Sequence, residues 1–262
     1  MDDILLVEQY DGWRKFTLNR PAIMNALSVA MVQRLLAEMD AAEADPATRA
    51  VVLTGAGRGF CAGQELGAEV MPTEAGPPDL EALAGTWHHV AVARIRASRL
   101  PFIAAVNGVA AGAGAAFALA CDFVLAAKSA TFVQAFVRIG LVPDSGASWF
   151  LSRSVGDARG RALALLGDAV PAQQAADWGM IWRAVDDAAL MTDAEALATR
   201  MVQAPAEAIA GIKALFAAAP TNTLQQQLDL EAKLQGKAGR SAEFAEGVRA
   251  FKEKRPPRYR PG

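Results

Sequence analysis

The sequence predicts a mixed α/β fold that ends in a helical C-terminal region. Short apolar strands, glycine-rich loops and helical patterns alternate as far as about residue 190, and only helical patterns occur from about Thr192 onward. The 262 residues, 53% of them hydrophobic, are enough to bury a large core. We therefore expect an α/β core over residues 1–190 and a helical region over residues 191–262, packed on the core or on a neighbouring subunit.

The first predicted elements are a hairpin and a capped helix. Two β-rich runs within residues 4–21 flank Asp11–Gly12, a pair typical of a two-residue hairpin turn. Ser28 is predicted to cap a helix that runs to about Ala44, because apolar residues recur on one face of that segment. The pair Asp45–Pro46 is expected to end this helix.

The central elements repeat the order strand, loop and helix. Residues 50–55 and 102–106 are predicted to be short buried strands. Residues 79–99 are predicted to be helical, with an apolar stripe made of Leu80, Leu83, Trp87 and Val90. The remaining elements of the core are predicted as a helix of small residues that ends near Ala120 and strands over residues 122–127 and 131–134.

Composition and charge exclude several classes of protein. The net charge of −2 gives no electrostatic basis for binding nucleic acid. Cys61 and Cys121 are the only cysteines, so we expect no disulfide framework and a cytoplasmic protein. No signal peptide is expected at the acidic N-terminus. Residues 101–127 are apolar but interrupted by Asn107–Gly108 and Asp122, so we expect no membrane span.

Two glycine-rich loops follow predicted strands. They are FCAGQEL at residues 60–66 and NGVAAGAG at residues 107–114. Turns from a strand into a helix leave main-chain N–H groups unpaired, and glycine lets a ligand approach them closely. Two such groups aimed at one point would form an oxyanion hole. Alternatively, these glycines only make tight turns or permit close packing of a helix.

Other kinds of site are not supported. The run from Gly112 to Phe117 has two glycines of a dinucleotide fingerprint but lacks the third, and no Gly-Lys-Ser/Thr triplet or G-x-S-x-G elbow occurs. His88 and His89 are adjacent, so they lack the spacing of a zinc pair, and we expect both to be ordinary helix-surface or interface residues. Cys61 is expected to be a buried thiol. We therefore expect no metal site.

Asp144 is set in the otherwise uncharged stretch GLVPDSG, residues 140–146. One interpretation is a helix N-cap, because Asp, Ser and Gly favour that position and Pro143 can close the preceding turn. The other is an acid at the mouth of an apolar pocket, made apolar by Phe136 and Trp149, where it could act as a base. These residues alone leave both interpretations open.

Five stretches, in this order along the chain, together resemble the crotonase, or enoyl-CoA hydratase/isomerase, superfamily: LNRPAIMNALS, FCAGQEL, AAVNGVAAGAG, GLVPDSGAS and AADWGMIWRAV. The resemblance implies a spiral of ββα repeats with a helical C-terminal trimerisation region. It implies an acyl-CoA substrate, with coenzyme A as part of that substrate and no other cofactor. It also implies a homotrimer or hexamer as the assembly.

The resemblance carries site residues onto this chain. The thioester oxygen would lie between the main-chain N–H groups of Gln64 and Ala113. Hydratases of the superfamily use two glutamates, and this chain has Ala116 and Phe136 at those places, so ordinary hydration is disfavoured. Asp144 stands where isomerases carry a single acid. The implied coenzyme A and substrate contacts are Ala22, Ile23, Met24, Ala26, Ala62, Gly63, Glu65, Leu66, Val109, Gly112, Phe136 and Pro143.

Within the superfamily, the stretch from Thr221 to Tyr259 resembles the isomerases of phenylacetate degradation. These enzymes convert ring-1,2-epoxyphenylacetyl-CoA, that is 2-(1,2-epoxy-1,2-dihydrophenyl)acetyl-CoA, to an oxepin thioester. The alternatives are a Δ3,Δ2-enoyl-CoA isomerase that acts on linear substrates and a non-catalytic acyl-CoA-binding protein of the crotonase fold. The sequence thus predicts an isomerase with Asp144 as its one proton carrier.

Overall fold

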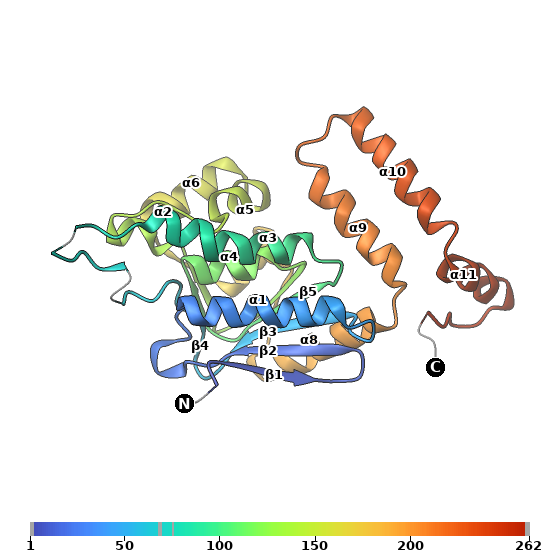
Figure 1. Cartoon of the computed structure of the whole chain (residues 1–262), viewed down its shortest axis with the longest axis horizontal. Coiled ribbons are helices and arrows are strands. Elements are labelled where there is room, and N and C mark those ends of the chain that lie inside the picture. Colours follow the sequence, from blue (N-terminus) through green and yellow to red (C-terminus); the bar gives the residue numbers. More distant parts are fainter. Residues whose placement is uncertain (1–2, 68–69, 75, 260–262) are drawn as a thin grey trace.

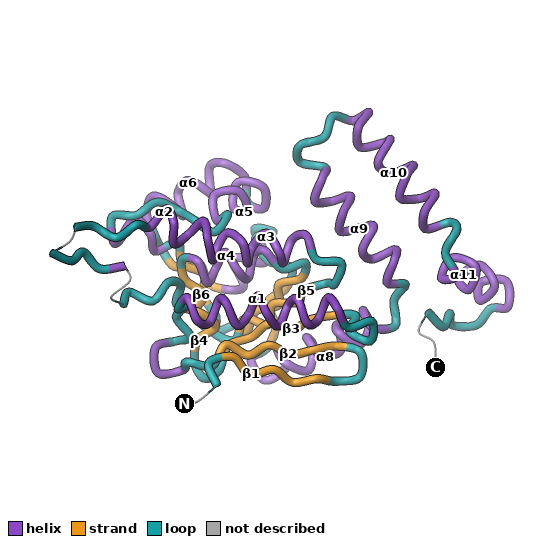
Figure 2. The backbone as a smooth tube through the Cα atoms, viewed as in Figure 1, coloured by secondary structure: helices purple, strands orange, loops and turns teal. Residues whose placement is uncertain are grey.

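The computed structural model describes residues 3–67, 70–74 and 76–259. Figure 1 shows an α/β body and a helical arm that extends from it. We define the body as residues 3–202 and the arm as residues 206–253. In Figure 2 the strands lie in the body, and the arm contains only helix and loop. The mixed α/β class with C-terminal helices, predicted above, is confirmed.

The larger sheet has six strands in the order β1-β2-β3-β5-β7-β10. β1 and β2 form the predicted antiparallel hairpin around Asp11–Gly12, where Gly12 has a φ of 85° that favours glycine. The other pairings are parallel, and β3 and β5 are completely buried and apolar apart from Thr54, as parallel strands covered on both faces require. The strands are β1 Leu5–Gln9, β2 Trp13–Leu18, β3 Ala50–Gly55, β5 Phe102–Val106, β7 Phe123–Ala127 and β10 Arg183–Val185.

A second sheet of four short strands has the order β4-β6-β8-β9. β4, β6 and β8 each follow a strand of the larger sheet after a short connection, so the chain steps repeatedly from one sheet to the other. The loops after β4 and β6 therefore lie side by side, because these two strands are parallel neighbours. The strands are β4 Gly59–Cys61, β6 Val109–Ala111, β8 Thr131–Val133 and β9 Ala169–Pro171.

Helices of the body cover the sheets. The predicted cap of α1 is confirmed, because the Ser28 side chain accepts a hydrogen bond from the Met31 N–H. Phe16, Phe60 and Phe102 are among the largest side chains of the buried core. The helices are α1 Val29–Ala44, α2 Leu80–Leu83, α3 His89–Ala97, α4 Ala113–Ala120, α5 Ala147–Ser154, α6 Gly156–Leu166, α7 Ala172–Asp177 and α8 Leu190–Val202.

The predicted helix over residues 79–99 contains a π-helical segment, Ala84–His88, between α2 and α3. In this segment the N–H of His89 bonds the carbonyl of Ala84, five residues back instead of four. The extra residue rotates the following helix relative to the preceding one. The predicted stripe is therefore wrong beyond the π segment: Val90 is 39% exposed, and Ala91 and Ile95 are buried in its place.

The arm consists of α9 Ala206–Ala218, α10 Leu224–Ala238 and α11 Ala242–Glu253. Lys213 of α9 joins it to the body through hydrogen bonds to the carbonyl of Leu100, at 2.7 Å, and to Asp122. No residue of α9 or α10 is buried. The predicted boundary at residue 190 falls at the start of α8, but α8 packs on the larger sheet with five buried residues and so belongs to the body.

The apolar stretch over residues 101–127 is divided among β5, β6, α4 and β7. Within the described part of the chain, none of the helices has the length and apolar character needed to cross a bilayer.

Candidate active site

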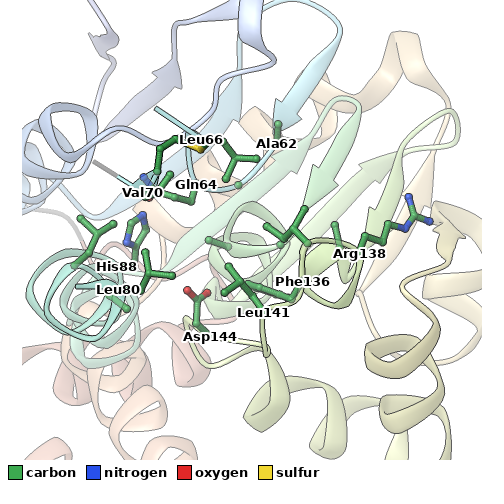
Figure 3. A pocket seen from close by; sticks show the side chains of 18 residues that line it. Ala62, Gln64, Leu66, Val70, Leu80, His88, Phe136, Arg138, Leu141 and Asp144 are labelled. Atoms are coloured by element: carbon green, nitrogen blue, oxygen red, sulfur yellow. The ribbon is translucent and has the colours of Figure 1, made fainter. Parts of the chain in front are cut away.

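A cavity of about 470 Å³ opens between the loops that follow β4 and β6 and the helical segment over residues 80–88 (Figure 3). Apolar side chains make up most of its lining, and Asp144 is the one acid among the described residues there. The lining residues are Ala62, Gly63, Gln64, Leu66, Val70, Met71, Leu80, Leu83, Ala84, His88, Gly112, Ala113, Ala135, Phe136, Arg138, Ile139, Leu141 and Asp144.

The loop after β4 presents the main chain of Gln64 to the cavity. Gly63 has a φ of 91°, and a Cβ added there would lie only 2.8 Å from the carbonyl oxygen of Ala111, so both conformation and space require glycine. Leu27 pairs with this loop through its N–H to the Gly63 oxygen, at 2.7 Å, and its oxygen from the Glu65 N–H, at 2.9 Å. This pairing uses Gly63 and Glu65 but not the N–H of Gln64, which has no acceptor among the described residues.

The loop after β6 presents the N–H of Ala113 in the same way. Ala113 is the first residue of α4, so no carbonyl of that helix can accept from its N–H. Gly112 before it has a φ of 51°, and a Cβ at Gly114 would lie 2.3 Å from the carbonyl oxygen of Cys61. The glycines therefore serve tight turns and close packing, and the same close packing brings the two loops together: an added Cβ at Gly63 would lie 3.4 Å from the nitrogen of Ala113.

Asp144 lies in the loop before α5, and its carboxylate points into the cavity (Figure 3). It is not a helix cap: Gly146 occupies the cap position with a φ of 77°, and the Ala147 N–H bonds the main-chain oxygen of Asp144 at 2.9 Å. Ser145 also has a positive φ, 51°, which is strained for a serine. The Oδ1 atom of Asp144 is buried and has no hydrogen-bond partner. The carboxylate is therefore available to a ligand.

The surroundings of Asp144 are apolar on the side of Phe136. This ring is buried, contacts the buried residues Ala116 and Ala147, and lines the cavity. Trp149 does not take part as expected, because it is 37% exposed, stacks on the guanidinium of Arg153 and lines a different surface depression. Ala116 and Phe136 bring no acid or base to the site.

His88 corrects an expectation. Its side chain is only 2% exposed, lines the cavity and leaves the Nε2 atom without a hydrogen-bond partner, whereas a surface or interface position was expected. Burial lowers the pKa of the imidazole, although the negative charge of Asp144 acts in the opposite direction. His89, by contrast, is exposed as predicted. Two adjacent histidines carry no sequence signal that tells which of them faces inward.

The other predicted binding residues fall into two groups. Ala62, Gly63, Leu66, Gly112 and Phe136 line the cavity. The remainder are not among the described residues that line it: Ala22, Ile23, Met24, Ala26, Glu65, Val109 and Pro143.

The segment over residues 20–27 nevertheless lies beside the loop after β4. The Ala62 N–H bonds the oxygen of Met24 at 2.9 Å, and the buried amide of Asn25 bonds the oxygen of Gly59 at 2.7 Å. Arg20 forms two hydrogen bonds with Glu65, at 2.6 and 2.9 Å, which lower the pKa of the Glu65 carboxyl. Glu65 thus joins the two segments.

No group of three His, Cys, Asp or Glu side chains in the described ranges could hold a metal ion. Both cysteines are unpaired and buried, as expected for Cys61, and burial raises the pKa of that thiol to about 12. The thiol of Cys61 is therefore not a nucleophile at neutral pH.

Three comparisons place this geometry among known proteins. A family model described as enoyl-CoA hydratase/isomerase matches residues 8–261. A probable enoyl-CoA hydratase from Rhodobacter capsulatus is 46% identical, with 95% of each chain covered, and 1,2-epoxyphenylacetyl-CoA isomerase from Escherichia coli is 44% identical, with 99% of each covered. The crystal structure of an enoyl-CoA hydratase from Polaromonas superposes with a TM-score of 0.92 at 35% identity, covering 98% of this chain and 99% of that one.

Proposed function

Because the chain belongs to the enoyl-CoA hydratase/isomerase family and has its crotonase-type fold, we propose that it is an acyl-CoA isomerase that moves one proton with Asp144. One observation carries the proposal: Asp144, whose carboxylate is the one acid among the described lining residues and has an unpartnered oxygen, faces a mostly apolar cavity whose opposite wall offers two main-chain N–H groups. A lone carboxylate can both remove a proton and return it.

The chemistry needs no more than these groups. The N–H groups of Gln64 and Ala113 hold the thioester oxygen of the substrate, and Asp144 removes the proton from the α-carbon. The electron pair of the broken C–H bond moves onto the thioester oxygen as an enolate, which the two N–H groups stabilise. Asp144 then returns the proton to a different carbon, and the double bond is displaced. Nothing is oxidised or reduced, so no cofactor is required beyond the coenzyme A of the substrate.

For the substrate, we propose ring-1,2-epoxyphenylacetyl-CoA, which becomes oxepin-CoA. The C–C bond shared by the epoxide and the six-membered ring breaks, its electron pair enters the rearranged double bonds of the seven-membered ring, and Asp144 moves the α-proton to a ring carbon. The likeness to the isomerase of Escherichia coli over 99% of both chains supports this choice. The cavity is lined by Leu80, Leu83, Phe136 and Leu141, and these apolar side chains can pack against an apolar ring. They also exclude water from a reactive enolate. Linear 3-enoyl-CoA thioesters, which need the same proton transfer, are the alternative substrates.

Coenzyme A is proposed to lie along residues 22–26 and 62–66. These two segments are joined by main-chain hydrogen bonds and by the Arg20–Glu65 ion pair, so they form one continuous surface beside the cavity mouth. Contacts from the main chain would dominate there, since Ala22 and Ala26 have no polar side chain.

The test is a product assay in which ring-epoxide and linear 3-enoyl thioesters are offered side by side, with products identified by mass spectrometry and NMR. We expect the oxepin thioester to form fastest. Asp144→Asn should lower turnover by roughly a thousandfold or more, in the range of general acid–base catalysis, and still bind coenzyme A. Turnover near that of the unmodified protein in Asp144→Asn would refute the proposal, and absence of isomerisation in the unmodified protein would favour a non-catalytic acyl-CoA-binding protein.

A homotrimer or hexamer is proposed as the assembly. The arm exposes apolar side chains that its own chain leaves uncovered, among them Phe216 at 72%, Leu224 at 76% and Phe251 at 85%. Such surfaces mark protein interfaces, and the resemblance to an oligomeric superfamily favours copies of the same chain as the occupants. Analytical ultracentrifugation should give three or six times the monomer mass, and a monomer at micromolar concentration would contradict this.

A further inference from the structure

The geometry points to His88 as a positioning residue for Asp144: its Nε2 atom accepts a hydrogen bond from the carboxyl while Asp144 holds the substrate proton. This inference rests on the proposed function, in which Asp144 is the proton carrier. It adds an imidazole to a site that was predicted to contain Asp144 as its one proton carrier.

The placement of His88 is the first support. His88 is only 2% exposed, yet its Nε2 atom has no hydrogen-bond partner. Both His88 and Asp144 line the same cavity. Figure 3 shows the two side chains reaching the cavity from different elements, the π segment and the loop before α5. A buried acceptor without a partner is costly, so a hydrogen-bond donor at this position during the reaction would explain why the imidazole is there.

The π segment is the second support. Leu80, Leu83 and Ala84 line the cavity, and in a regular α-helix Trp87 would lie near the middle of that face and His88 at its edge. The extra residue in the π segment rotates His88 from that edge toward the cavity, and Trp87 packs against the core. Segments of this kind are rare and occur frequently at functional sites. The irregularity thus has a specific result, which is an imidazole in the cavity.

The protonation of the ring is the third support. Burial lowers the pKa of His88, which favours the neutral form near pH 7. The main-chain carbonyl of Leu83 acts to raise this pKa, and because Nε2 has no partner, we place the N–H proton of the neutral ring on Nδ1. Nε2 is then the nitrogen with a free lone pair, and it can only accept.

The proposed step conserves protons and electrons. When Asp144 removes the α-proton, the C–H bond breaks, its electron pair forms the enolate and the carboxylate becomes a neutral carboxyl. The new O–H donates to Nε2 of His88, which holds the carboxyl in place for the return of the proton. When the proton moves to its new carbon, the enolate collapses and Asp144 is a carboxylate again. His88 is neutral before, during and after the reaction.

The test compares His88→Phe, His88→Gln and His89→Phe with the unmodified protein, using the thioester that is turned over fastest. We expect His88→Phe, which keeps the volume but cannot accept a hydrogen bond, to lower kcat roughly 10- to 100-fold with KM changed less than threefold. His88→Gln, whose amide oxygen can replace Nε2, should recover most of that loss. His89→Phe, the matched control on the exposed neighbour, should leave kcat unchanged.

A double variant separates this inference from the proposed function. If His88 acts through Asp144, adding His88→Phe to Asp144→Asn should lower kcat less than twofold further. Should Asp144→Asn retain turnover, the proposed function fails whatever His88 does. Should Asp144→Asn abolish turnover while His88→Phe has normal kcat, or while Phe and Gln at position 88 are equally impaired, only the role of His88 is refuted. If His88→Phe does not fold, His88→Met makes the same comparison.

Discussion

The cavity has two walls of different construction. The glycine wall, formed by Gly63, Gln64, Gly112 and Ala113, faces the cavity largely with main-chain atoms held by two short parallel strands. The side-chain wall is formed by His88, Phe136 and Asp144. These residues come from the π segment, the 3-10 turn Ala135–Ile139 and the loop before α5. The glycine wall is fixed by steric contacts within the sheet region. The side-chain wall depends on the conformation of three separate segments, which determines the side chains that face the cavity.

This difference separates what is general in the site from what is specific. A pair of main-chain N–H groups stabilises an enolate or other oxyanion whatever the acyl group is, so the glycine wall alone does not select a reaction. The acids and bases stand on the side-chain wall, and they decide where a proton can go. Changing the side-chain wall should therefore change which reaction occurs, and changing the glycine wall should slow every reaction.

The largest effect that we expect is the difference in rate between hydration of crotonyl-CoA and isomerisation of the preferred thioester. Water addition needs a base for the water and an acid for the α-carbon, and Ala116 and Phe136 supply neither. We expect hydration at least about a thousandfold slower than isomerisation of the preferred thioester, the contribution typical of a missing acid–base pair. The loss of the enoyl thioester absorbance measures it. Fast hydration would show that Asp144, with His88 or another group, activates water, and that the side-chain wall does not exclude hydration.

Gly63→Ala tests the glycine wall. The new Cβ would lie 2.8 Å from the Ala111 oxygen at a φ of 91°, so the loop must shift and carry the Gln64 N–H with it. We expect kcat to fall about 100- to 1,000-fold for ring and linear thioesters alike, the loss typical of one oxyanion donor. Gly156→Ala is the control, because Gly156 has a φ of 79° but open space around it. An equal loss of activity in both variants would mean that backbone strain, and not the position of the N–H, is responsible.

The two walls also differ in how far the sequence could predict them. Gly63 and Gly112 stand in short motifs whose spacing after a strand indicates exposed N–H groups, and the structure places both beside the cavity. His88 was missed because neither adjacent histidine belongs to the predicted stripe, and a hydrophobic stripe cannot reveal the extra residue that rotates the helix within the π segment. Trp149 was misplaced for a related reason, since the direction of α5 depends on the left-handed residues Ser145 and Gly146.

The smallest expected effect concerns the Arg20–Glu65 ion pair, which joins residues 20–27 to the loop that carries Gly63 and Gln64. Arg20→Met should lower the free energy of unfolding by about 0.5–1 kcal/mol at pH 7, because the pair is only partly buried. It should also raise KM for the thioester with little change in kcat. Arg161→Met is the control, since the Arg161–Asp157 pair is far more exposed and lies away from the cavity.

The pH dependence of this effect distinguishes the ion pair from simple packing. Hydrogen bonds from Arg20 lower the pKa of Glu65, so the stabilisation is complete above the ordinary glutamate value of about 4.3 and is lost as the pH falls through the lowered value of the folded protein. The difference in unfolding free energy between the unmodified protein and Arg20→Met, measured by urea titration, should therefore shrink on acidification below about pH 4. A difference that stays constant into the acid range would assign the effect to the hydrogen bond from Arg20 to the carbonyl of Ala26, which no change in pH removes.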